Sequence, residues 1–192
     1  MKNVCIIFLL SVIISLTALG LSGNFENEGT TSAFTEQSLV QNEEYLRIHV
    51  RADSNENGAQ AVKYKVRDRV VEYLTPLVAS YKTKAQAMEG IAKNLEKIAA
   101  VATQVLHEEG FAYSAKASLR REEFPTRVYG EYVLPAGEYT ALILELGRGE
   151  GDNWWCVVYP PLCFAAVDTD VVYRSKILEI IEDWKADHDG VE

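Results

Sequence analysis

The first 44 residues limit what this chain can fold into, because neither of their two segments has the pattern of a packed core. Lys2 is the only charged residue among the first 25, and residues 4–21 are almost wholly apolar. With the small residues Ala18 and Gly20 at the −3 and −1 positions of a cleavage site, this pattern is typical of a secretory signal peptide. The apolar run is also long enough to cross a bilayer, which takes roughly 17 to 25 helical residues. Residues 1–21 are therefore predicted to be a signal peptide or an N-terminal membrane anchor.

A polar segment without periodicity follows in residues 22–44. It is rich in Ser, Thr, Asn, Glu and Gly and holds only scattered apolar residues. Such a segment cannot bury enough surface to offset the entropy of ordering the chain, so we expect a flexible linker. The remainder, residues 45–192, has the usual size of one domain with a single core.

The exported part of the chain is strongly acidic. Beyond Gly20 it carries 18 Lys and Arg against 28 Asp and Glu, a formal charge of −10. This charge repels polyanions, and the compact basic cluster at Arg120 and Arg121 is followed at once by two glutamates. We therefore expect no nucleic-acid partner, whereas the N-terminal segment is expected to contact the membrane.

Two cysteines remain outside the export segment, Cys156 and Cys163. In an oxidising compartment an even pair usually forms a disulfide. Here the bond would close a short loop over Pro160 and Pro161. The alternative is that both cysteines are small buried apolar residues.

Hydrophobic periodicity predicts three helices. Apolar residues at three- and four-residue steps predict the first over residues 62–81, with Pro76 kinking it or ending it near Thr75. Thr83 begins a capping box for a second helix that ends at Gly110. A third, over residues 173–184, is expected to begin with Asp168 or Thr169 as its cap.

Alternating or short apolar runs predict the strands. The opening strand covers residues 45–51, and four more runs follow the second helix at 111–119, 126–133, 139–146 and 154–159. Strands in such close succession pair most easily in antiparallel fashion. The predicted fold is a single α+β domain with a mainly antiparallel sheet of about five strands and three helices on one face.

Few residues have a pattern that predicts catalysis. His49, His107 and His188 have no partner at metal-ligand spacing. Glu131 and Glu138 flank a turn, but their spacing in sequence does not establish the geometry of a glycosidase pair. A nucleophilic Cys163 is unexpected where a second cysteine is available for a disulfide. We therefore expect no catalytic residues, no metal and no cofactor.

A dense run of uncommon residues provides the most specific signal. Phe-Pro-Thr-Arg-Val-Tyr-Gly occupies residues 124–130, Leu-Pro-Ala-Gly-Glu-Tyr-Thr-Ala-Leu occupies 134–142, and Asn-Trp-Trp-Cys begins a block at 153–163 that ends in Pro-Pro-Leu-Cys. In these blocks and their order the chain resembles the stage II sporulation protein R family of endospore-forming bacteria. The resemblance covers essentially residues 45–167.

The resemblance implies a signalling protein without enzymatic activity. It implies export from the forespore into the space between the forespore and mother-cell membranes, with a possible anchor in the N-terminal segment. The implied partner is a membrane-embedded aspartic protease that processes the precursor of an early mother-cell sigma factor. Two alternatives are a peptidoglycan hydrolase of the cell envelope, which needs close carboxylates or a metal, and a carrier of lipids or small molecules, which needs a large apolar cavity.

The two adjacent tryptophans suggest a contact surface. Successive side chains of a strand point to opposite faces, so Trp154 and Trp155 cannot both enter one core. Exposed tryptophans are common at binding hot spots. We therefore expect a partner surface built from the outward tryptophan, Arg127 and Tyr129. In the alternative interpretation, a loop or the last helix shields the second face.

Overall fold

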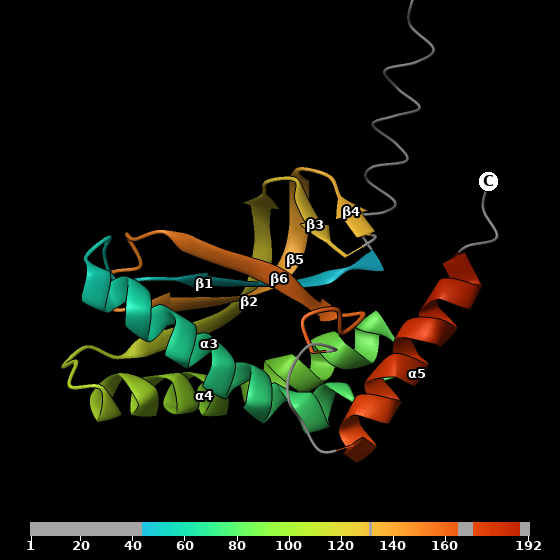
Figure 1. Cartoon of the computed structure of the whole chain (residues 1–192), viewed down its shortest axis with the longest axis horizontal. Helices are drawn as coiled ribbons and strands as arrows, with labels where there is room; N and C mark the ends of the chain where they lie inside the picture. Colours follow the sequence, from blue (N-terminus) through green and yellow to red (C-terminus); the bar gives the residue numbers. More distant parts are fainter. Residues whose placement is uncertain (1–43, 131, 165–170, 189–192) are drawn as a thin grey trace, which may run out of the picture. The chain divides into compact units, whose positions relative to one another are not determined.

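The computed structural model describes residues 44–130, 132–164 and 171–188 (Figure 1). These residues form three helices and six strands, which confirms the predicted α+β class. Their order is β1 (Leu46–Arg51), α3 (Asn57–Val78), α4 (Lys84–Glu108), β2 (Ala115–Phe124), β3 (Arg127–Tyr129), β4 (Tyr132–Leu134), β5 (Gly137–Leu146), β6 (Asn153–Tyr159) and α5 (Val171–His188).

The main sheet has four strands in the order β2-β5-β1-β6. β2 pairs with β5 and β1 pairs with β6 in antiparallel fashion, so the sheet is mainly antiparallel as predicted. The central pair, β1 and β5, is parallel. A parallel pair needs a long crossover connection, and the segment from α3 to β4 provides it.

Two of the predicted strands differ from those in the structure. The expected strand at 126–133 is a hairpin of β3 and β4, because Gly130 adopts a φ of +62° that lets the chain reverse. The expected strand at 111–119 begins later and continues to Phe124, since the charged residues 120–123 extend the β2 ladder rather than ending it. The hairpin forms its own two-stranded sheet.

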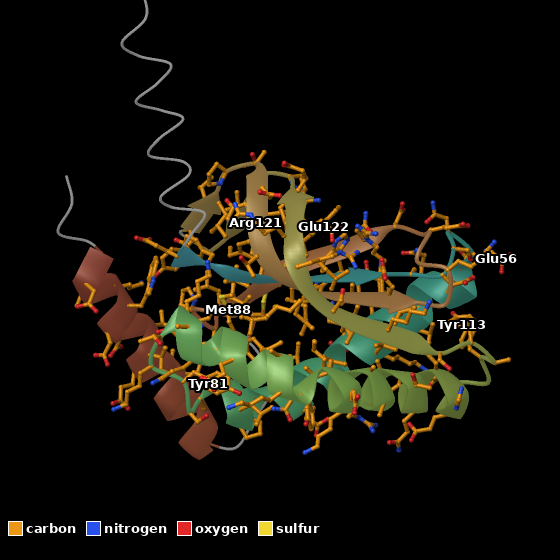
Figure 2. All side chains as sticks on the ribbon, turned by 180° about the vertical axis from the view of Figure 1, so that it is seen from behind. Glu56, Tyr81, Met88, Tyr113, Arg121 and Glu122 are labelled. Atoms are coloured by element: carbon orange, nitrogen blue, oxygen red, sulfur yellow. A yellow bond between two sulfur atoms is a disulfide. The ribbon has the colours of Figure 1, made fainter. Side chains whose placement is uncertain are left out.

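The inner face of the main sheet is the face covered by α3 and α4, which lie together below it in Figure 1. The even-numbered residues of β1, and those of β5 from Leu142 to Leu146, point into this layer; Ile48 and Leu142 are both at most 1% exposed. Val66 of α3 and Ile98 of α4 meet them with no exposed surface. In Figure 2, Met88 lies between α4 and the sheet.

The predicted ends of the second helix are observed, whereas the first helix, expected over residues 62–81, begins earlier, at Asn57, and ends at Val78. Thr83 caps α4, its hydroxyl accepting from the Gln86 N–H at 3.2 Å, while the Gln86 side chain accepts from the Lys82 N–H rather than from that of Thr83. Gly110 has a φ of +84° and forms the predicted left-handed cap. Pro76 does not end α3 near Thr75, because the helix continues to Val78 with the proline in its last turn.

α5 packs on the core through Ile177 and Ile181, and its Trp184 contacts Tyr45 and Tyr132. Its predicted cap, Asp168 or Thr169, lies outside the described residues. So do the predicted export segment at 1–21 and all but the last residue of the predicted linker at 22–44. Within the part of the chain that the structure describes, no helix combines the length and apolar character needed to span a membrane.

Candidate functional site

The outer face of the main sheet, turned away from α3 and α4, gathers most of the charged and aromatic side chains of the strands. The β3–β4 hairpin packs on this face (Figure 1). Odd-numbered residues of β1 point to it, in the order Arg47, His49 and Arg51. Figure 2 shows Glu122 on the part of β2 that rises away from the helices.

Arg47 is fully buried beneath the hairpin. Its guanidinium carbon lies 4.3 Å from the ring centre of Phe124 and 4.8 Å from that of Tyr139. From the hairpin, the Tyr129 hydroxyl accepts a hydrogen bond from Arg47 Nη2 at 2.7 Å. Burial lowers the pKa of Arg47, while Tyr129 raises it in part, and an arginine remains charged in such a site.

The charge of Arg47 has no acidic partner among the described residues. Its Nε and Nη1 atoms also form no hydrogen bond within that set. Burying a charge without a counter-ion costs several kcal/mol in order of magnitude. Aromatic ring faces, which attract cations, supply part of the compensation. Arg47 is therefore a polar residue held in place chiefly by aromatic rings.

A network of charged residues covers the neighbouring part of the outer face. Glu122 contacts Arg51, and Glu145 pairs with Arg51 at 3.4 Å and with Arg120 at 3.0 Å. Arg120 also lies 3.6 Å from the second oxygen of Glu122. Both arginines of the basic cluster noted in the sequence are thus paired with glutamates, Arg120 with Glu122 and Glu145, and Arg121 with Glu138.

His49 lies in the middle of this face and is only 3% exposed. Its ring stacks on Trp155 at 5.4 Å, and its Nδ1 is 3.2 Å from Glu122 Oε1. Burial is the main cause that lowers the pKa of His49 to about 4, and the charges of Arg51 and Arg120 act in the same direction. The imidazole is therefore neutral at neutral pH, with Nδ1 as the donor to the Glu122 carboxylate.

The structure separates the two tryptophans of the predicted partner surface. Trp154 packs against the inner core, with Arg67 of α3 over its ring at 5.4 Å. Trp155 packs on the outer face, with the guanidinium of Arg127 over its ring at 4.3 Å. Arg127, Tyr129 and Trp155 therefore lie together, and Trp154 lies on the opposite side of the sheet.

These three residues face the sheet and are only partly exposed to solvent. Arg127 contacts Trp155, Tyr129 contacts Arg47, and all three are half-buried. The outward side of the hairpin carries Val128 and Val133, a cross-strand pair exposed at 64% and 63%. The sequence pattern did not indicate the two valines, because residues 126–133 have the pattern of one strand. It did not indicate Arg47 either: alternation along β1 sets Arg47 opposite Leu46 and Ile48 but does not show that a hairpin covers it.

The disulfide joins Cys156 of β6 to Cys163, with Cα atoms 6.0 Å apart. Cys156 is buried in the inner core, and Cys163 contacts the clusters on both faces. The loop that the bond closes contains Pro160 and Pro161, as expected from the sequence. The bond therefore links the middle of β6 to a segment that borders the outer face.

The residues weighed as catalytic do not converge within the described part of the chain. His49 is buried on the outer face and His107 is exposed near the end of α4. Glu138 is exposed and pairs with Arg121 at 2.7 Å. Glu131 and the His188 side chain lie outside the described residues. Within those residues no cluster of three or more His, Cys, Asp or Glu has the geometry to hold a metal ion.

A hollow of about 630 Å³ lies between α5 and the turn that joins α3 to α4. Aromatic side chains, Tyr81, Tyr159 and Trp184, line part of it. Lys82 and Asp183 are among the charged residues of its wall. This mixed lining differs from the enclosed apolar cavity that a lipid carrier needs.

Comparisons with known proteins agree with the sequence motifs. The family model of stage II sporulation protein R matches residues 42–169, a range that contains β1 to β6 and both sheet faces. The chain is 34% identical over 163 residues to stage II sporulation protein R of Bacillus subtilis (strain 168), which covers 85% of this chain and 71% of that protein. No solved structure gave a significant match. On the strength of the family match and of this relative, the chain belongs to the stage II sporulation protein R family.

Proposed function

We propose that this chain is an exported sporulation signal that activates a membrane-embedded aspartic protease by binding to it. The protease then processes the precursor of an early mother-cell sigma factor. In this proposal the chain crosses the forespore membrane, works in the space between the two membranes and carries out no reaction of its own.

Family membership, through the match over residues 42–169, is the observation that carries this proposal. Two features of the chain are compatible with it. The start of the sequence has the charge and apolar pattern of an export segment. On the outer face, the charged residues form ion pairs with one another, and the exposed apolar surface of the hairpin offers a place for a protein contact.

The contact surface is proposed to lie on the outer face around the hairpin. Arg127 and Trp155 form its rim beside the sheet, and Tyr129 connects it to the buried Arg47. Arg127 forms no ion pair with another described residue, so its charge is able to meet a carboxylate of the protease. Trp154 is left out of the proposed surface because it packs under α3.

The direct test is reconstitution. The full chain, purified from an oxidising compartment, is added to the membrane protease in nanodiscs together with the sigma-factor precursor. We expect cleavage of the precursor to depend on the chain and to saturate with its concentration. Absence of any stimulation by a folded, disulfide-bonded chain would contradict the proposal.

A second set of variants separates signalling from hydrolysis. Ala substitutions at Glu131, Glu138, His49 and His107 are expected to leave activation largely intact in every variant that remains folded, because a ligand needs no general acid or base. Loss of activation without loss of stability at one of these positions would favour the peptidoglycan hydrolase, as would release of soluble fragments from purified peptidoglycan.

A further inference from the structure

We propose that the outward side of the β3–β4 hairpin, formed by Val128 and Val133, is the surface that docks on the protease, and that the buried Arg47 positions this surface. The inference rests on the proposed function and deepens it. It specifies the partner segment by its chemistry as an extended, apolar stretch of the protease's extracytoplasmic part with a carboxylate close by.

The exposure of the two valines sets them apart from the other apolar residues. Four large apolar side chains are exposed among the described residues, and the remaining two, Tyr64 and Leu178, lie on separate helices. Val128 and Val133 are instead direct neighbours across the hairpin ladder and form one patch. Adjacent exposed apolar residues favour a binding surface over random surface composition.

The main chain of the hairpin supports an extended partner. β3 and β4 pair with each other and with no strand of the main sheet. Within the described chain, their main-chain groups form no other backbone–backbone bonds. The outer edge of each strand therefore has no backbone partner among the described residues, and an extended segment pairs with such an edge by adding a strand, so that its side chains lie beside the valine of that strand.

Charge favours the protease over a second copy of the chain. Arg127, at the rim of the hairpin, has no ion pair with another described residue. A carboxylate of the partner segment would fill this role. Two copies of the chain would bring two strongly acidic molecules together, since the full sequence has a net charge of −9.

No strand pairing joins the hairpin to the main sheet, so contacts between side chains hold it there. Arg47 makes one of these contacts. Its Nη2 donates to the Tyr129 hydroxyl at 2.7 Å, and its guanidinium carbon lies 5.6 Å from the centre of the Tyr129 ring. A fully buried charge without an acidic partner is costly, and a methionine of similar volume would fill the same space without this cost. The fixed orientation of Tyr129, and through it of the adjacent Val128, is what arginine adds.

The docking surface is tested with the double variant Val128→Ser/Val133→Ser in the nanodisc reconstitution. Loss of both apolar contacts is expected to lower activation at subsaturating concentration by about tenfold or more. The thermal midpoint is expected to stay within a few degrees of the wild type, because the valines are exposed. Leu178→Ser, which changes another exposed apolar residue, is the matched control and should leave activation unchanged.

Each contrary outcome has a distinct meaning. Activation by the double variant within twofold of the wild type would overturn the docking surface, as would an equal loss in Leu178→Ser. Sedimentation of the wild type as a dimer and of the double variant as a monomer would show that the valines bind a second copy, and would also overturn it. If the wild-type chain itself fails to stimulate cleavage, the proposed function fails first.

The role of Arg47 is tested with Arg47→Met and Tyr129→Phe. Both should raise amide hydrogen exchange of residues 127–134 by about tenfold and lower activation, while the thermal midpoint of Arg47→Met changes little because a buried charge is removed. Val66→Ala is the control, because it destabilises the inner core and leaves the contacts of the hairpin unchanged. Amide hydrogen exchange of residues 127–134 should therefore be slower in Val66→Ala than in Arg47→Met or Tyr129→Phe. Unchanged hairpin exchange and normal activation in Arg47→Met would overturn the positioning role.

Discussion

The inner and outer faces of the main sheet are buried by different chemistry. On the inner face, α3 and α4 place aliphatic side chains against aliphatic strands, and 26 buried residues of the described chain form one cluster. On the outer face, the buried cluster has seven of the described residues, and paired charges, aromatic rings and a small hairpin provide the cover. Aliphatic packing needs no individual partners, whereas the buried polar groups on the outer face, such as Arg47 and His49, depend on particular neighbours for compensation.

This difference indicates a division of roles. The inner face supplies most of the folding free energy, because that energy scales with the apolar area removed from water. The outer face contributes less area and contains costly groups such as the Arg47 guanidinium, which has no acidic partner among the described residues. Groups that cost stability and yet fix a surface geometry are typical of functional sites.

The largest expected effect compares two neighbouring residues of β5. Leu142 faces the inner core and Ile143 the outer face, and both are fully buried. Leu142→Ala is expected to cost about 4 kcal/mol of unfolding free energy, and Ile143→Ala about 2 kcal/mol, because long polar side chains on the outer face can move into the cavity. Urea unfolding of the two variants measures the difference. Equal costs would show that both faces are packed with the same rigidity.

Acid should weaken the outer face selectively through His49. Its pKa is about 4 in the folded chain and close to 6.5 in the unfolded chain, so the unfolded state binds more protons between these values. Stability is therefore expected to fall as the pH decreases from about 6.5 to about 4, by up to about 3 kcal/mol. Urea unfolding over this pH range gives the slope, and the difference from His49→Gln isolates the histidine. Identical slopes in both proteins would exclude this assignment.

The disulfide between Cys156 and Cys163 is expected to raise the unfolding free energy by linking segments on the two faces. In the chain-entropy model a loop this short contributes about 2.5 kcal/mol. Reduction with dithiothreitol should lower the unfolding free energy by about that amount, whereas Cys156→Ala/Cys163→Ala should no longer respond to reductant. Labelling that finds both thiols free in the exported wild type would contradict the bond itself.

The sequence was informative where structure depends on local pattern. The 3.6-residue period of apolar residues predicted α3 and α4. The caps at Thr83 and Gly110 follow from local backbone chemistry. The disulfide was predicted because the two cysteines lie seven residues apart beside two prolines. Alternation also separated Trp154 from Trp155. Each of these features is set by residues close together in the chain.

Features that depend on distant residues could not be predicted. The parallel pairing of β1 with β5 joins segments about ninety residues apart, and strand succession alone favoured antiparallel neighbours. The hairpin was taken as one strand because its apolar and aromatic residues continue through Gly130. Burial of Arg47 requires Phe124, Tyr129 and Tyr139 to meet around it, which only the tertiary fold determines.

Site-specific photocrosslinking tests most directly whether the hairpin side of the molecule meets the protease. A photoreactive amino acid replaces Val128 in one full-length variant and Leu178 of α5, which is also exposed, in another, and both are mixed with the membrane protease in nanodiscs. We expect a crosslinked product with the protease from position 128 and none from position 178. A product from position 178 alone, from a chain that still activates the protease, would contradict this expectation.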